Sequence, residues 1–211
     1  MRHITAADIK AFDKLFRLNL VNGLPGYKPA NLIGTAAPDG ATNLAIFSSV
    51  LHLGSDPALL GMVTRPTTVP RHTYENIRAT GCFTINHVPA SLVGEAHYTS
   101  ANFAREESEF AQCGFTASYR HNFPAPYVAE SPISIGLRLV DELPIERNGT
   151  VLLIGEVAHV YLPEAALNPD GTLNLPATDA ACISGLDAYH RVTPLAEFAY
   201  ARAGQGPQPK S

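Results

Sequence analysis

Alternating apolar and less apolar positions mark the longest strands of the chain. Between residues 133 and 140, every odd position is Ile or Leu, and the even positions hold mainly small or polar residues, which is the period of a half-buried strand. A second apolar run covers residues 151–162. Between the two runs, Asn148-Gly149 favours a type I′ hairpin turn, because both residues tolerate positive φ. The two segments are therefore predicted to pair as an antiparallel hairpin.

Four shorter runs predict further strands in the first half of the chain. Residues 32–35 and 42–47 flank Pro38-Asp39-Gly40, a turn signal that predicts a second hairpin. Residues 58–63 and 82–87 have the composition of a third and a fourth strand. Six or more strands that do not alternate regularly with helices disfavour a doubly wound parallel sheet. The pattern favours a mainly β, mostly antiparallel barrel.

Three segments are expected to be helical. Apolar residues of the segment 5–18 fall on one face, and Thr5 is a suitable N-cap for it. Residues 67–80 are expected to form a helix that ends at Gly81. Much of the segment 89–115 is also expected to be helical. We expect these helices to lie at the periphery of the barrel.

Length and composition indicate one folded domain. The chain has 211 residues, 45% hydrophobic and 16% charged, so it can bury a core. We expect a single domain over residues 1–203 and a mobile tail over 204–211, where no apolar pattern remains. The formal net charge of −4 argues against nucleic acid or an anionic membrane as the main partner. No apolar run reaches the length of a membrane helix and the first residues lack a signal-like apolar region, so a cytoplasmic location is expected.

Familiar catalytic motifs are missing. The chain has no G-x-S-x-G, no P-loop, no H-E-x-x-H, and no G-x-G-x-x-G after a strand. The eight histidines are irregularly spaced, and the three cysteines form no C-x-x-C pair. We therefore predict neither a metal site nor a protein nucleophile.

Polar residues gather where predicted strands end. The strand 42–47 runs into Ser48-Ser49, and Thr64-Arg65-Pro66 follows the next strand. Thr73 and Asn76 lie one turn apart on the predicted helix and share a face. Arginine, hydroxyl and amide groups together suit a phosphate. Helix capping by the hydroxyls and a surface ion pair of Arg65 is the alternative interpretation.

Several motifs in one order resemble a known family. The sequence is similar to the flavin reductase-like, FMN-binding split-barrel family, including its flavoredoxin-like branch, over about residues 28 to 190. The motifs that carry the resemblance are Asn43-Leu44-Ala45-Ile46-Phe47-Ser48-Ser49, Ser55-Asp56-Pro57, Gly61-Met62-Val63-Thr64-Arg65-Pro66, Thr73-x-x-Asn76-Ile77, Thr80-Gly81-Cys82-Phe83-Thr84-Ile85-Asn86, Ser108-Glu109-Phe110, Gly114-Phe115 and Ile154-Gly155-Glu156-Val157.

The resemblance implies a six-stranded antiparallel split barrel that forms a homodimer, with FMN near the subunit interface. It implies that the strand ending at Ser49 lines the flavin ring, and that the Arg65 turn and the following helix approach the ribityl phosphate. The apolar helix Ile9–Phe16 and the aromatic segment Phe123–Tyr127 are expected to cover the open side of the barrel in the dimer. The residues expected to bind the cofactor are Lys28, Asn43, Leu44, Ala45, Phe47, Ser48, Ser49, Thr64, Arg65, Pro66, Thr73, Asn76, Asn86 and His97.

Flavin chemistry accounts for the missing catalytic motifs, because hydride transfer from a nicotinamide needs no protein nucleophile. Two functions agree with the resemblance. In the first, the protein is an enzyme that oxidises NADH or NADPH and reduces flavin or another small acceptor. In the second, it is an FMN-holding electron carrier that a partner protein reduces. A barrel that binds no flavin, with Arg65 serving another anion, is a third and more distant possibility.

Overall fold

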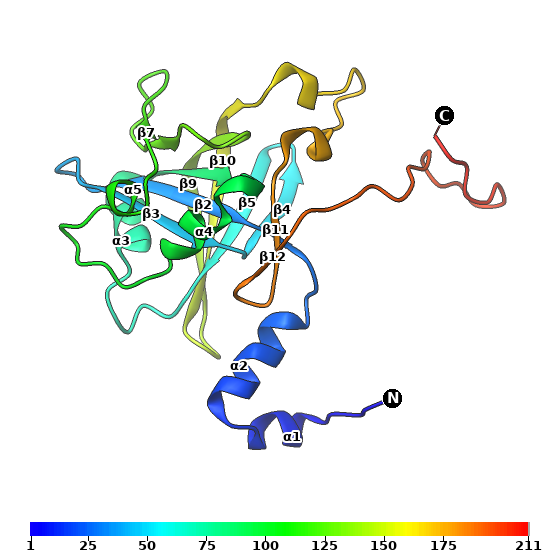
Figure 1. The fold of residues 1–211 in the computed structure, drawn as a ribbon, viewed down its shortest axis with the longest axis horizontal. Helices are drawn as coiled ribbons and strands as arrows, with labels where there is room; N and C mark the ends of the chain where they lie inside the picture. Colours follow the sequence, from blue (N-terminus) through cyan, green and yellow to red (C-terminus); the bar gives the residue numbers. More distant parts are fainter. Residues whose placement is uncertain (211) are drawn as a thin grey trace.

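The computed structural model describes residues 1–210, and its centre is one antiparallel sheet (Figure 1). The sheet has the strand order β3-β2-β6-β9-β10-β5-β4. Its strands are β2 (Asn31–Ala36), β3 (Thr42–Phe47), β4 (Val50–Ser55), β5 (Ala58–Thr64), β6 (Cys82–His87), β9 (Ser134–Ile145) and β10 (Thr150–Tyr161). The mainly β antiparallel architecture is confirmed, but the expected count of six strands is wrong, because β4 adds a seventh strand beside β5.

The sheet curls into a barrel whose two edges are joined by the chain itself. The edge strands β3 and β4 are consecutive in sequence and are separated only by Ser48 and Ser49. Beside this connection, the Ser49 hydroxyl donates to the Val63 carbonyl (2.7 Å), and the Val63 amide donates to the Ser49 carbonyl (3.2 Å). The strands β3 and β4 form no ladder with each other within residues 1–210. The barrel is thus closed at Ser48-Ser49 and split beyond it.

One hydrophobic core fills the barrel. It is formed by alternate residues of the strands together with one residue of the helix α3 (His72–Thr80). Its buried members are Ile33, Met62, Ile77, Phe83, Ile85, Leu137, Val151 and Leu153. The alternation that predicts β9 from the sequence is the alternation that fills this core.

A second core lies on the outer face of the same sheet. Leu32 and Leu44 project there and pack with Val88, Phe110 and Val128. The elements that cover this face include α4 (Val93–Tyr98), α5 (Glu109–Gln112), β7 (Ala117–Ser118) and β8 (Tyr127–Val128). All six residues of β2 are buried, because the strand is covered on both faces.

The segment Phe123–Tyr127 belongs to this outer layer and not to an open surface. Phe123, Ala125 and Tyr127 are buried in a small cluster with Cys82. They pack on their own chain, because the segment lies across the outer face of β6 and β9, where the small residues Cys82, Thr84 and Gly136 leave room for it. The expectation that this segment covers a partner subunit is therefore wrong.

The helices are shorter than the sequence suggests. The helix α3 begins at His72, after Pro70, and Gly81 ends it in the left-handed conformation with φ 69°. Residues 67–71 are a loop. In the segment 89–115 only η1 (Ala90–Leu92), α4 and α5 are helical, and an irregular loop joins α4 to α5.

The N-terminal segment forms an arm that stands away from the barrel (Figure 1). It contains two helices, α1 (Ala6–Ala11) and α2 (Lys14–Gly23), and not the single helix expected over residues 5–18. Asp13 separates them, because its carboxylate accepts hydrogen bonds from the Leu15 and Phe16 amides and so starts a new helix. Neither helix contributes a buried residue. The arm therefore presents its apolar side chains to solvent.

The remaining elements connect the arm and the C-terminal region to the barrel. A small sheet is formed by β1 (Lys28–Pro29), β11 (Cys182–Ser184) and β12 (Ala188–His190). Two 3-10 helices, η2 (Glu164–Ala166) and η3 (Leu175–Thr178), follow β10. Among residues 1–210, no helix has both the length and the apolar character needed to cross a bilayer.

The hairpin β9–β10 is confirmed, but its turn is not type I′. Only Gly149 of the expected pair adopts positive φ (72°). Asn148 instead uses its side chain, whose oxygen accepts from the Thr150 amide (3.1 Å). The connection spans residues 146–149 between the paired residues Ile145 and Thr150. Asparagine thus acts here through its side chain and not through a left-handed backbone.

The last residues run away from the barrel (Figure 1). An isolated bridge joins Phe198 to Pro209, and Lys210 pairs with Asp170 at 3.2 Å. The mobility of the tail 204–211 stays a prediction, and its final residue, Ser211, lies outside the described residues.

Candidate functional site

The connection between the barrel edges brings the expected ring-lining residues together. Ala45, Phe47 and Ser48 are half-buried along β3 and its end. Phe47 packs against the inner core, and the Ser49 hydroxyl is bound to β5. Leu44 is buried in the outer core, so only its backbone is near this edge.

The end of β5 places Arg65 close to the same connection. Val63 pairs with Ser49, and Thr64 is buried with its hydroxyl donating to the Arg65 carbonyl (3.2 Å). The Arg65 side chain is exposed and has no hydrogen-bond or ion-pair partner among residues 1–210. Pro66 follows and is half-buried. A buried strand end thus carries an uncompensated guanidinium group.

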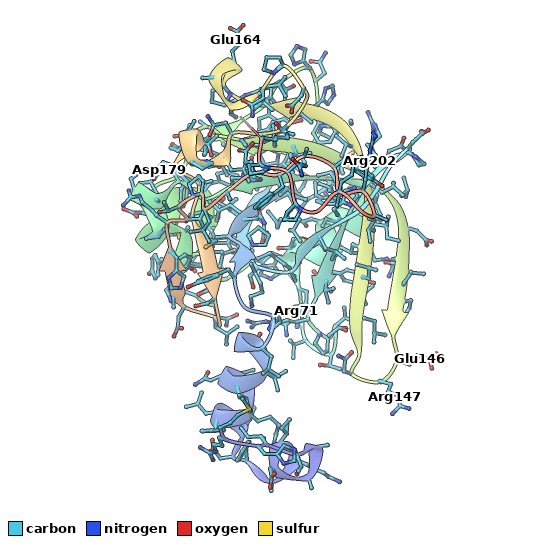
Figure 2. All side chains as sticks on the ribbon, turned by 90° about the vertical axis from the view of Figure 1, so that its right-hand side faces the viewer. Arg71, Glu146, Arg147, Glu164, Asp179 and Arg202 are labelled. Carbon is cyan, nitrogen blue, oxygen red and sulfur yellow. The ribbon has the colours of Figure 1, made fainter. Side chains whose placement is uncertain are left out.

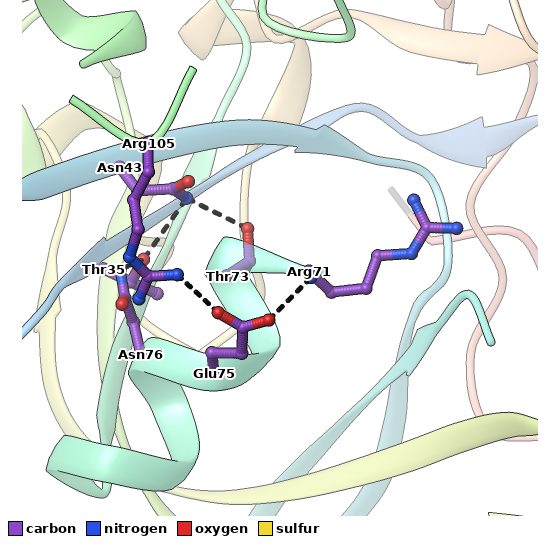
Figure 3. Close-up of polar contacts among 7 residues, drawn as sticks. All are labelled: Thr35, Asn43, Arg71, Thr73, Glu75, Asn76 and Arg105. Atoms are coloured by element: carbon purple, nitrogen blue, oxygen red, sulfur yellow. Dashed lines mark hydrogen bonds and ion pairs between the residues drawn. The ribbon is translucent and has the colours of Figure 1, made fainter. Parts of the chain in front are cut away.

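A second arginine that the sequence analysis missed lies beside this turn. Arg71 is the N-cap residue of α3, and its Nε donates to the Pro66 carbonyl (3.2 Å). Its backbone amide donates to the Glu75 carboxylate (3.0 Å), while its terminal guanidinium nitrogens have no partner in the described chain. Figure 3 shows this side chain directed away from the neighbouring polar residues. Because the helix was expected to begin at residue 67, the sequence placed Arg71 inside the helix and gave no signal for its position at the helix start.

Four of the polar residues near α3 form a buried amide–hydroxyl network (Figure 3). The Asn43 side-chain nitrogen donates to the hydroxyls of Thr35 (3.3 Å) and Thr73 (3.0 Å), and the Asn76 nitrogen donates to Thr35 (3.2 Å). All four residues are buried. These bonds hold α3 against β2 and β3. Asn43, Thr73 and Asn76, which were expected to bind the cofactor, thus have a structural role.

The carboxylate of Glu75 lies at the edge of this network and holds two groups. It accepts from the Arg71 amide and pairs with Arg105 (Figure 3). The bond to Arg105, together with that amide, holds the pKa of Glu75 below its usual value. Glu75 thus stays ionised at the start of α3 and completes its N-terminal cap.

Three other expected residues lie apart from the barrel connection. Asn86 is fully buried, with its nitrogen donating to the Leu32 carbonyl (3.1 Å) and its oxygen accepting from the Val128 amide (3.1 Å). The Lys28 ammonium donates to the carbonyls of Asn22 and Gly185, and burial lowers its pKa. His97 lies on α4, where its Nδ1 is 3.1 Å from the Tyr189 hydroxyl.

We call the remaining constellation, residues 45–49 and 64–71, the seam site. It combines a strand edge, the hydroxyls of Ser48, Thr67 and Thr68, and two arginines whose terminal nitrogens are free. In the described part of the chain, no three His, Cys, Asp or Glu side chains meet in a way that could hold a metal ion. The donors of the seam site are cations and hydroxyls, which suit an oxyanion such as a phosphate.

A comparison with protein families matches residues 27–178 to the flavin reductase like domain. The chain belongs to the flavin reductase-like family. The resemblance found in the sequence is thereby confirmed, and flavin is the class of cofactor that this family membership supports.

Solved structures of similar proteins have the same fold. A protein from Shewanella frigidimarina, described as a flavin reductase with a split barrel domain, is 45% identical, with a TM-score of 0.92 over 95% of this chain and 100% of its own. The flavoredoxin of Desulfovibrio vulgaris is 26% identical, with a TM-score of 0.71 over 86% of this chain and 93% of its own. Component B of nitrilotriacetate monooxygenase from Bacillus cereus is 20% identical, with a TM-score of 0.82 over 93% and 98% of the two chains, and shares the fold.

Proposed function

We propose that this flavin reductase-like protein is an FMN-dependent oxidoreductase that takes hydride from NADH or NADPH and reduces free flavin or another small acceptor. The observation that carries the proposal is the pair of arginines at the seam site whose terminal nitrogens are free, in a chain whose family membership indicates flavin. A flavin, when bound, accepts the hydride and passes its electrons on. The chain then has to bind the flavin, orient it and leave one face accessible.

The donor set of the seam site fits a terminal monophosphate. A phosphate carries about −1.5 to −2 charges at neutral pH and three acceptor oxygens. Arg65 and Arg71 supply two guanidinium groups, and Thr67 and Thr68 supply exposed hydroxyls. Since no second nucleotide-binding motif is evident in the sequence, FMN suits the site better than FAD.

The strand edge is suited to the flavin ring. Ala45, Ser48 and Ser49 are small, so a planar ring could approach the backbone of β3 without obstruction, and its far face would stay open for a nicotinamide. The buried amide–hydroxyl network contributes indirectly, because it fixes α3 and hence the position of Arg71. In this proposal Asn43, Thr73 and Asn76 are positioning residues.

The identity of the flavin tests the cofactor assignment. The protein is purified, its bound flavin is released by heat, and the supernatant is analysed by chromatography. We expect a yellow protein that releases FMN. Recovery of FAD alone would contradict the phosphate assignment, and a colourless protein that also fails to bind added FMN would contradict the flavin function altogether.

A second function is favoured by one specific comparison. The flavoredoxin of Desulfovibrio vulgaris covers 86% of this chain at 26% identity, which supports an FMN-holding electron carrier reduced by a partner protein. A carrier should present a strongly charged docking face, whereas the charged residues of this chain are interspersed and the net charge is only −4. We therefore favour the reductase.

A further inference from the structure

A cluster of rings and cations lies on the outer face of the barrel, at the end of β10. His159 and Tyr161 project from the last residues of β10, and His121 reaches them from the loop after β7. The three rings lie nearly parallel, with interplanar angles of 15° to 21° and centroids 5.8 to 6.2 Å apart. We call these three residues the ring cluster.

A hydrogen bond and two edge-on aromatic contacts fix the orientation of the rings in the cluster. The His121 Nδ1 is hydrogen-bonded to the Tyr161 hydroxyl at 2.7 Å. The buried Phe123 packs edge-on against His159 (5.5 Å), and the buried Tyr127 packs edge-on against Tyr161 (5.0 Å). Each ring is thereby held without using the remaining nitrogens of His121 and His159.

Arg120 adds a permanent positive charge to the ring cluster. Its guanidinium lies 4.9 Å from the centre of the Tyr161 ring, and its Nε contacts the Ser118 hydroxyl at 3.4 Å. No carboxylate in residues 1–210 comes within 4 Å of the charged atoms of Arg120, His121 or His159. The terminal nitrogens of Arg120 are free of side-chain partners in the same residues.

The groups of the cluster that remain free are the terminal nitrogens of Arg120, the unbonded imidazole nitrogens and the flat ring surfaces. A planar Arg guanidinium matches a carboxylate bidentately, and aromatic rings prefer parallel-displaced or edge-on contact with another ring. From this geometry we infer that Arg120 and the ring cluster form a second binding site, which takes a small planar aromatic carboxylate. The carboxylate binds Arg120, and the aromatic ring lies against His121, His159 and Tyr161.

This site is separate from the seam site. Thr64, at the seam, pairs with Val151 near the start of β10, whereas His159 and Tyr161 lie near its end. A ligand at the ring cluster can therefore bind while the seam site is filled. Because the ring cluster uses no flavin contact, the second site does not depend on whether the protein is a reductase or a carrier.

Titration of the protein with benzoate in the presence of saturating FMN tests the inference. Isothermal calorimetry should give saturable binding with a Kd on the order of 1 mM, as expected for so small a ligand. In parallel, the side-chain NMR signals of His121 and His159 should shift with the same midpoint. Cyclohexanecarboxylate, which has the charge without the flat ring, and inorganic phosphate should both bind at least threefold more weakly.

Variants assign the binding to the cluster. Arg120→Gln should weaken benzoate binding about tenfold or more, the loss expected for hydrogen bonds to a charged group. Arg147→Gln is the matched control, since Arg147 lies at the tip of the β9–β10 hairpin, away from the β10 end that leads to Glu164 (Figure 2). If Arg120→Gln does not fold, Arg120→Lys and His159→Gln replace it, and each should weaken binding at least threefold.

Three results would overturn the inference. They are the absence of saturable benzoate binding, equal binding of cyclohexanecarboxylate, and a benzoate affinity that the Arg120 and His159 variants leave unchanged.

Discussion

The guanidinium group of Arg65 is exposed at the end of a buried strand, which makes it the residue most directly concerned with a phosphate. Replacing Arg65 by Ala should lower the affinity for FMN by roughly 1.5 to 3 kcal/mol, the range for a lost hydrogen bond to a charged group. The fold should be unchanged, because the side chain has no partner in the described chain. Quenching of FMN fluorescence measures the affinity.

Arg147→Ala is the control for this experiment, since it removes the same charge from a hairpin tip. An Arg65→Ala variant that binds FMN as tightly as the parent protein would show that the phosphate lies elsewhere.

Thr35 is the centre of the buried amide–hydroxyl network, where its hydroxyl accepts from both Asn43 and Asn76. Thr35→Val keeps the shape but leaves the buried Asn76 amide nitrogen without an acceptor and removes one of the two acceptors of Asn43, so the free energy of unfolding should fall by about 1 to 3 kcal/mol. Urea denaturation measures it. Thr116→Val, at an exposed position, should change stability by less than about 0.5 kcal/mol, and equal effects of the two variants would refute the role of the network.

The network also shows which residue contacts could not be predicted from the sequence. Local spacing places Thr73 and Asn76 on one face of a helix, but it does not say that this face meets Thr35 and Asn43 on the sheet. The orientation of α3 depends on its packing through Ile77 into the barrel core. Arg71 was missed because the helix predicted over residues 67–80 placed it inside the helix, whereas α3 begins only at His72.

At the scale of elements, α5 protects the free edge of β3. The Glu109 carboxylate accepts from the Leu44 amide at 3.0 Å, and Ser108 contacts Thr42 at 2.7 Å. An edge strand with unpaired amides is prone to pair with other chains. Because Glu109 is buried, desolvation raises its pKa above the ordinary value of 4.5.

This raised pKa predicts a pH dependence of stability. The folded state binds the Glu109 proton more tightly than the unfolded state does. The contribution of Glu109 to the free energy of unfolding is therefore largest below about pH 4.5, and it is lost as the pH rises through the folded-state pKa. Glu109→Gln keeps an acceptor for Leu44 but cannot ionise. The stability of the variant relative to the parent should therefore be higher at pH 8 than at pH 5.

Chemical denaturation of both proteins at the two pH values checks this prediction, because all other titrating groups are shared and cancel. A difference in stability that is the same at pH 5 and pH 8 would contradict it.

The elements that the sequence predicted correctly are those with two buried faces or strict alternation. The strands β2, β3, β5, β6, β9 and β10 all pack into a core. The strand β4 was missed because it is a largely exposed edge strand with a mixed sequence, Val50 to Ser55. The arm was predicted as one helix because apolar spacing continues across the break, and only the capping bonds of Asp13 divide it.

At the scale of the whole molecule, the arm leaves apolar surface without a partner on its own chain. Leu15, Leu18 and Val21 of α2 are 45% to 64% exposed, although the helix is only ten residues long. Isolated helices of this length are marginal in water. We propose that the arm packs on a second copy of the chain, so that the protein is a homodimer.

Light scattering should give a mass twice the 22.6 kDa of one chain. The double variant Leu15→Glu/Val21→Glu should shift the protein toward the monomer, because it charges the apolar face of α2. Leu167→Glu, which charges an exposed leucine next to η2, is the matched control and should stay dimeric. A parent protein of 22.6 kDa at micromolar concentration would rule out the dimer.

The central claim is that the protein is a nicotinamide-dependent reductase, and the reduction of its bound flavin tests this most directly. The FMN-loaded protein is mixed under anaerobic conditions with excess NADH and, separately, with excess NADPH, and the flavin absorbance is followed. We predict that at least one of them bleaches the flavin band within seconds to minutes. If neither does so on that timescale, while dithionite does, the reductase claim is contradicted and the protein is an electron carrier.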